Sequence, residues 1–214
     1  MSTEPSHRKK FSTLLRAGAR KVDSHPKSRS AKIELRYAVL SSIGRSNAHV
    51  FDAFAGSGGM YRAVWRKAAS YVGCDVRWCK DSRLAYVADN RRVMRCIDLA
   101  RFNVFDFDSY GSPWDAAMIL AARRVVAAGE TIGVVLTEGS GLNLKMSKMP
   151  IGLAAIAGID GPVAGAIRRQ DELIDMAVAG MCRRMSCRVL KRWQAEGHSG
   201  AQVRYIGLIL GRRS

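Results

Sequence analysis

An apolar segment that runs directly into a glycine-rich turn most restricts what this chain can fold into. Residues 49–54 are mostly apolar and read as a buried strand, and glycines follow at positions 56, 58 and 59. Glycine lets the backbone approach a ligand closely, and the first turn of a helix presents free N–H groups. The order of strand, glycine turn and helix therefore predicts a βα unit with a ligand site at its turn.

Strand-like and helical patterns alternate through the middle of the chain. This alternation is typical of a parallel sheet that is covered by helices on both faces. A helix that begins near Ser30 and stops at Gly44 precedes the alternation, and another is expected over 167–185. The alternating elements are expected strands at 49–54, 71–76, 94–98, 103–107 and 131–137, and expected helices near 58–69, 80–90 and 113–128.

The end of the chain has a different pattern. Residues 187–193 and 202–210 both read as strands, and a short glycine-containing loop separates them. Two such runs around a short loop predict a β-hairpin. The whole pattern predicts an α/β domain in which five parallel strands are followed by an antiparallel hairpin.

The charge of the chain points to a polyanionic partner. Its 35 Lys and Arg residues outnumber its 18 Asp and Glu residues, for a formal net charge of +17. Nucleic acid is the first candidate, because basic side chains gain affinity by releasing counterions from phosphates. Residues 1–30 are interpreted as a flexible basic arm that orders on this partner or stays a solvated tail, and residues 31–214 as one domain. Five residues of the arm are candidate nucleic-acid contacts: Arg8, Lys9, Lys10, Arg20 and Lys21.

Several classes of protein are disfavoured by the composition. No run of eighteen apolar residues is present, and the N-terminus lacks the apolar stretch of a secretory signal. The five cysteines are unevenly spaced, which favours a reduced, cytoplasmic setting over a disulfide framework or a zinc site. No metal is expected, and the sequence leaves the oligomeric state open.

The glycine-rich turn reads Asp-Ala-Phe-Ala-Gly-Ser-Gly-Gly over residues 52–59. This wording resembles the first motif of S-adenosylmethionine-dependent methyltransferases, notably those that modify nucleic-acid bases. The resemblance implies the class I fold, which is a Rossmann-like, mostly parallel seven-stranded sheet with a C-terminal antiparallel hairpin and helices on both faces. It also implies S-adenosyl-L-methionine as the cofactor. In such a site Asp75 would bind the ribose hydroxyls and Asp98 the adenine amino group. The remaining cofactor-binding residues that it implies are Asp52, Phe54, Gly56 and Gly58.

A second motif follows the expected fourth strand. Residues 108–113 read Asp-Ser-Tyr-Gly-Ser-Pro, similar to the Asp-Pro-Tyr-Gly-Ser-Pro of transfer-RNA guanine N2-dimethyltransferases. The resemblance assigns Asp108 to the target amine and Tyr110 to stacking on the base, with Pro113 closing the motif. Ser109 stands where that family has proline. A cytosine C5 enzyme is excluded, because its nucleophilic cysteine follows a proline and no cysteine here does.

These observations predict methyl transfer to an exocyclic amino nitrogen of a nucleic-acid base, with RNA slightly favoured over DNA. The alternative is a catalytically inactive protein of the same fold that binds nucleic acid. A protein or small-molecule methyltransferase is disfavoured by the charge. The segment 137–150, with Lys145 and Lys148 as further candidate nucleic-acid contacts, is interpreted either as a lid over the substrate or as a surface loop.

Overall fold

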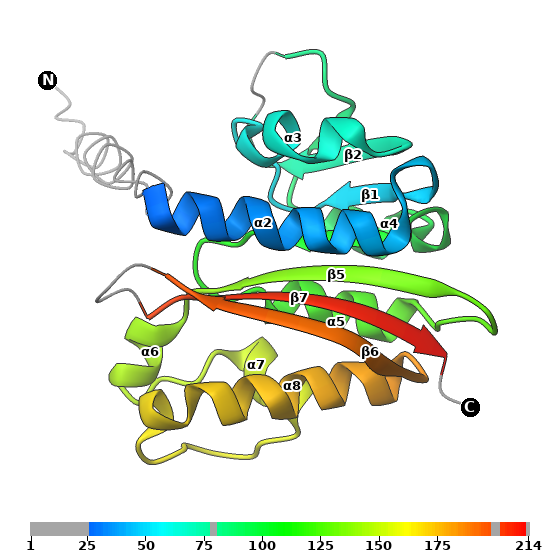
Figure 1. The fold of residues 1–214 in the computed structure, drawn as a ribbon. Helices are drawn as coiled ribbons and strands as arrows, with labels where there is room; N and C mark the ends of the chain where they lie inside the picture. The colour runs from blue at the N-terminus through cyan, green and yellow to red at the C-terminus, as the bar shows by residue number, and fades with distance from the viewer. Residues whose placement is uncertain (1–25, 78–80, 198–201, 213–214) are drawn as a thin grey trace, which may run out of the picture.

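Within residues 26–77, 81–197 and 202–212, which the computed structural model describes, seven strands form one sheet (Figure 1). The strand order is β3-β2-β1-β4-β5-β7-β6, and the first five strands along the chain are parallel. The last two pair antiparallel with each other, and β7 inserts beside β5. The strands are β1 (His49–Asp52), β2 (Ser70–Asp75), β3 (Ala85–Val87), β4 (Val104–Phe107), β5 (Thr131–Glu138), β6 (Cys187–Glu196) and β7 (Arg204–Arg212).

Helices cover both faces of this sheet. On one face α2 packs against β5 and β7, where Val39 lies among buried residues such as Val104 and Val135. On the other face α4, α5 and α8 bury residues such as Phe105 and Phe107 of β4. None of the described helices is both long and apolar enough to cross a membrane. The α-helices are α2 (Pro26–Ile43), α3 (Gly59–Ala63), α4 (Asn90–Cys96), α5 (Trp114–Arg123), α6 (Gly141–Lys145), α7 (Ile151–Ala157) and α8 (Gln170–Arg184).

The predicted architecture is confirmed. The sheet is parallel except for the C-terminal hairpin, and the helix expected over 167–185 is present as α8, preceded by the 3-10 turn η5 (Ala166–Arg169). The first described helix begins at Pro26 rather than near Ser30, and Ser28 is buried. Residues 26–30, which the sequence placed in the basic arm, are therefore the start of α2. The candidate contacts Arg8, Lys9, Lys10, Arg20 and Lys21 lie outside the described residues.

The prediction for residues 80–98 is wrong. A short strand, β3, lies where a helix was expected, and α4 occupies most of the expected strand at 94–98. All three residues of β3 are exposed, because it is an edge strand, so it lacks the apolar alternation that reveals a strand. In α4 only Val93 and Met94 are buried, and this short apolar run resembles a strand.

A glycine fixes how closely α8 approaches α7. A Cβ atom built on Gly180 would lie 1.7 Å from the carbonyl oxygen of Ile156, which is backbone and cannot move aside. We therefore expect Gly180→Ala to lower the free energy of unfolding by about 3 kcal/mol. Urea unfolding followed by circular dichroism measures this. Gly59→Ala is the matched control, since nothing lies within 4 Å of a Cβ there. An equal effect of the two variants would contradict the close packing.

Candidate active site at the carboxyl edge of the sheet

The glycine-rich turn after β1 depends on backbone angles that favour glycine. Gly56 has φ 46° and Gly58 has φ 77°, both in the left-handed region. The N–H group of Gly56 donates to Oδ2 of Asp75 at 2.8 Å, so the turn is fastened to the end of the neighbouring strand β2. The sequence signal at this turn reflects a real constraint on the backbone.

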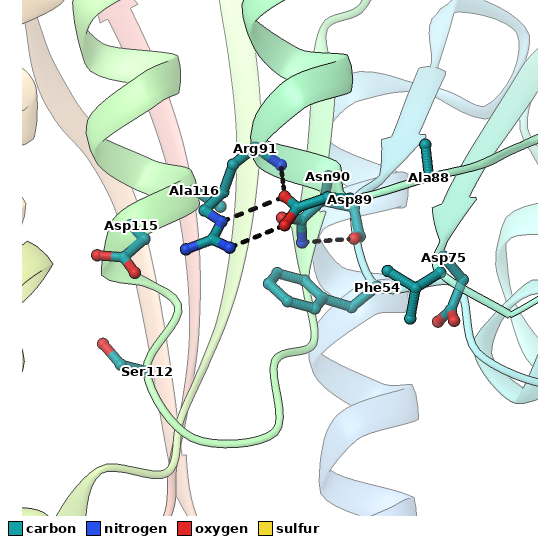
Figure 2. A pocket seen from close by; sticks show the side chains of 11 residues that line it. Phe54, Asp75, Ala88, Asp89, Asn90, Arg91, Ser112, Asp115 and Ala116 are labelled. Carbon is teal, nitrogen blue, oxygen red and sulfur yellow. Dashed lines mark hydrogen bonds and ion pairs between the residues drawn. The ribbon is translucent and has the colours of Figure 1, made fainter.

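A pocket of about 300 Å³ lies at the carboxyl ends of β1, β2 and β3 and the beginnings of α4 and α5 (Figure 2). Figure 2 shows the ring of Phe54 in the middle, between Asp75 on one side and Ser112 and Asp115 on the other. The pocket thus joins the two motifs that the sequence singled out. Its lining is Ala53, Phe54, Asp75, Val76, Ala88, Asp89, Asn90, Arg91, Ser112, Asp115 and Ala116.

Asp89 and Asn90 are site residues that the sequence reading missed. Asp89 is the second residue after β3 and caps α4, where its side chain accepts from the N–H of Arg91. Hydrogen bonds from Arg91 lower the pKa of Asp89 to about 2, so this carboxylate is charged. Asn90 donates to the carbonyl oxygen of Ala53 at 2.9 Å and ties α4 to the end of β1. The sequence signal that could have revealed Asp89 is its place just before a helix, because aspartate is a preferred N-cap residue.

Asp98 does not lie in this pocket. It precedes β4 instead of ending a strand, and its side chain accepts from the N–H of Ala100 to cap the 3-10 turn η4 (Leu99–Arg101). The prediction that Asp98 ends the third strand is wrong, because the strand itself was misplaced. The acid that follows the third strand is Asp89.

Asp52 is buried beneath the turn rather than facing the pocket. It is 2% exposed, and its carboxyl accepts from the N–H of Phe54 and the hydroxyl of Tyr71. Burial and the neighbouring Asp106, its register partner on β4, raise the pKa of Asp52 to about 8. A protonated Asp52 supports the turn from below.

Arg83 holds the glycine-rich turn from its other side. Its guanidinium donates to the carbonyl oxygens of Ala55 and Gly56, at 3.0 and 2.9 Å, and pairs with Asp81 at 2.8 Å. A Cβ atom at Gly58 would lie 2.7 Å from this guanidinium. A side chain at position 58 would have to displace the Arg83 guanidinium, in addition to adopting a positive φ.

The carboxylate of Asp108 is held by two cations that come from α2. Lys32 Nζ lies 2.7 Å from Oδ1 of Asp108, and Nη2 of Arg36 lies 3.4 Å from Oδ2. The hydroxyl of Thr137 donates to Oδ1 at 2.7 Å. Burial alone would raise the pKa of Asp108, but these contacts outweigh it and hold the pKa below its usual range. The side chain keeps 11% of its surface exposed.

Arg36 binds a second carboxylate. Its Nε and Nη2 atoms each lie 2.7 Å from an oxygen of Asp106, and the indole N–H of Trp65 also donates to Asp106 at 2.7 Å. Both Arg36 and Asp106 are fully buried. Lys32 and Arg36 lie outside both motifs that carry the methyltransferase resemblance.

The loop between Asp108 and α5 is anchored to β5. Ser109 is buried, and its hydroxyl donates to the carbonyl oxygen of Thr137 at 3.0 Å. The N–H of Gly139 donates to the carbonyl oxygen of Gly111 at 2.6 Å. Ser109 thus fixes the loop by a hydrogen bond that proline, which carries no hydroxyl group, would not make.

The remaining motif residues lie at the surface or begin α5. Tyr110 is 85% exposed, and Pro113 is the buried N-cap residue of α5. Lys145 ends α6 and Lys148 follows it, and both are exposed. Across the described ranges, no three His, Cys, Asp or Glu residues form a group that could hold a metal ion.

The same arrangement of strands occurs in solved methyltransferase structures. N-methyltransferase NodS from Bradyrhizobium japonicum WM9, in complex with S-adenosyl-L-homocysteine, matches with a TM-score of 0.55 and 12% identity over 95% of this chain and 98% of that one. The fold is that of the class I methyltransferases. Trm1 from Pyrococcus horikoshii, in complex with S-adenosyl-L-methionine, matches with a TM-score of 0.52 and 13% identity, over 85% of this chain and 55% of its own.

A putative hemolysin from Lactococcus lactis has the same fold, with a TM-score of 0.54 and 13% identity over 84% of this chain and 86% of that one. No protein-family model matches the chain, and no curated protein matches it either.

The proton on Asp52 makes stability depend on pH. The pKa of Asp52 rises from 3.8 to about 8 on folding, so the folded state binds a proton in this interval that the unfolded chain has released. The stabilisation that this proton contributes is fully present below pH 3.8 and is lost as the pH rises from there through about 8. Asp52→Asn is expected to flatten the fall in unfolding free energy over this interval. Urea unfolding at a series of pH values measures it, and an unchanged slope would contradict the protonated state.

Proposed function

We propose that the protein is an S-adenosyl-L-methionine-dependent methyltransferase that acts on an exocyclic amino nitrogen of a nucleic-acid base, with RNA favoured over DNA. One observation carries this proposal. A single pocket joins Phe54 and Asp75 near the glycine-rich turn to Ser112 in the motif that begins at Asp108. Ligands of open α/β sheets bind at this carboxyl edge.

The residues of the pocket fit the cofactor. Phe54, Val76 and Ala88 offer an apolar wall for a purine, and Asp75 offers a carboxylate for ribose hydroxyls. Bound there, S-adenosyl-L-methionine supplies a methyl group on a positively charged sulfur. The two neighbours NodS and Trm1 were crystallised with the product and the substrate forms of this cofactor, which supports the assignment.

The motif after β4 suits an amine substrate. The lone pair of an exocyclic base nitrogen is delocalised into the ring, so the nitrogen is a weak nucleophile. An ionised Asp108 that accepts its N–H groups would localise the lone pair and orient it, which is catalysis by positioning and electrostatics. The exposed ring of Tyr110 is available to stack on an extruded base, and Pro113 fixes the start of α5 behind it.

The choice of nucleic acid rests on charge and on the wording of the second motif. A net charge of +17 exceeds what solubility needs and suits a phosphate backbone. The Asp-Ser-Tyr-Gly-Ser-Pro sequence is similar to that of transfer-RNA guanine N2-dimethyltransferases. Lys145 and Lys148 are exposed and are proposed to contact the polymer together with the basic residues of the N-terminal segment.

Transfer of labelled methyl from S-adenosyl-L-methionine to unmodified RNA and DNA tests this function. We expect label in RNA and a loss of about 10²–10³-fold in rate for Asp108→Ala, because its hydrogen bonds matter most in the transition state. Asp160→Ala, which removes an exposed acid, is the matched control. Cofactor binding without label in either polymer would favour the inactive, nucleic-acid-binding alternative. Label in proteins or small molecules instead would contradict a nucleic-acid substrate.

Cofactor binding has its own test. Asp75→Asn is expected to weaken binding of S-adenosyl-L-homocysteine about 10–100-fold, since a ribose would lose a charged hydrogen-bond acceptor. Asp98→Asn should leave the affinity unchanged, because Asp98 caps η4 outside the pocket. Isothermal titration calorimetry measures both affinities. A larger loss of affinity in Asp98→Asn than in Asp75→Asn would contradict this cofactor site.

A further inference from the structure

The first described helix, α2, reaches the motif that the proposed function assigns to the target amine. Lys32 and Arg36 lie one turn apart on this helix, and both direct their charged groups at Asp108, at 2.7 and 3.4 Å. Their side chains are 6% and 0% exposed, so solvent screens these contacts little. Asp108 begins the motif whose Ser112 lines the pocket, and two buried cations at this one carboxylate exceed what a surface ion pair contributes.

We propose that Lys32 is a positioning residue for the methyl transfer, and that with Arg36 it fixes the Asp108 carboxylate in its ionised, hydrogen-bond-accepting state. This inference rests on the proposed function. Oδ1 lies 2.7 Å from Lys32 Nζ and accepts from the hydroxyl of Thr137 at 2.7 Å, whereas Oδ2 lies 3.4 Å from Nη2 of Arg36. Oδ2 is therefore the oxygen better placed to accept a substrate N–H.

The two cations also make Asp108 a weak base, so it does not retain the proton that the substrate releases. In the step that it serves, the base nitrogen forms a bond to the methyl carbon while the carbon–sulfur bond breaks and its electron pair goes to sulfur. The nitrogen then loses one proton, which ends in solvent. The two cations lower the pKa of Asp108, so it accepts hydrogen bonds without retaining this proton. The substituted nitrogen is itself strongly acidic at that moment, so a weak base is sufficient.

The groups around Asp108 define what a pH experiment reports. From α2 come Lys32 and Arg36, from β4 comes Asp106, and from β5 comes Thr137. The ring of Tyr205 on β7 lies 5.6 Å from Nζ of Lys32. Asp106 is neutralised by its bidentate contact with Arg36, so removal of Lys32 changes the charge felt by Asp108 and leaves the deeper pair intact.

The test compares Lys32→Met with Lys32→Arg, Thr137→Val and Lys67→Met. Lys67→Met is the matched control, since it removes a lysine whose Nζ contacts Tyr37 on the same helix α2 and not Asp108. Carbon-13 NMR of labelled aspartate carboxyls, assigned with Asp108→Asn, gives the titration midpoint of Asp108 without cofactor or substrate. We expect this midpoint to move to higher pH in Lys32→Met and to stay in place in Lys32→Arg and Lys67→Met.

The same variants are then assayed for methyl transfer across pH. Lys32→Met should lose about tenfold in kcat at the acid end of the profile and approach the wild type at the alkaline end, while Lys32→Arg restores the acid limb. Thr137→Val should move the acid limb in the same direction as Lys32→Met but by less, because the hydroxyl stabilises the ionised carboxylate without carrying a charge. An unmoved NMR midpoint in Lys32→Met overturns the ion pair. A moved midpoint with an unchanged pH profile overturns the role in transfer. Absence of transfer by the wild type overturns the proposed function itself.

Discussion

The buried contact between Arg36 and Asp106 holds the centre of this protein together. Its two hydrogen bonds of 2.7 Å join α2 to β4, and the indole of Trp65 adds the segment that follows α3. Asp106 lies in register with Asp52 on β1, so two acids meet inside the sheet. Without the guanidinium the carboxylate of Asp106 would be a buried charge with no cation beside it, and breaking such a buried pair costs about 3–5 kcal/mol. The helix α2 is therefore part of the domain.

The candidate site depends on both faces of the sheet. Asp106 and Asp108 face α2, whereas Phe105 and Phe107 point to the helices of the other side, as the alternation of a strand requires. The pocket lies between α4 and α5 on that other side. The loop from Ser109 to Ser112 connects the two, and it is hydrogen-bonded to Thr137 of β5 and to Gly139, the residue after β5. The proposed function requires a base amine to reach the methyl group across this loop.

The elements that have a strong local pattern in the sequence were predicted correctly. The glycine turn, the buried strands β1, β4 and β5 and the hairpin each carry a strong signal, and these elements determine the fold. The failure over 80–98 came from an exposed edge strand and a short helix with two adjacent buried residues, and it carried Asp98 into the wrong role. Lys32 and Arg36 could not be found in this way, because on a basic helix they read as solvated charges. Only the packing of α2 onto the sheet reveals their partners.

The cluster beneath the site has an even charge balance. Lys32 and Arg36 contribute two positive charges, and Asp106 and Asp108 contribute two negative charges. Asp52 adds none while it keeps its proton. Electroneutrality then constrains which residues can change: a cation and a carboxylate can be exchanged together for uncharged residues, whereas the loss of either one alone leaves a buried charge without its partner. In distant homologues these positions should therefore vary as pairs, so covariation between α2 and β4 becomes a means of recognising this site in chains too divergent to align by motif.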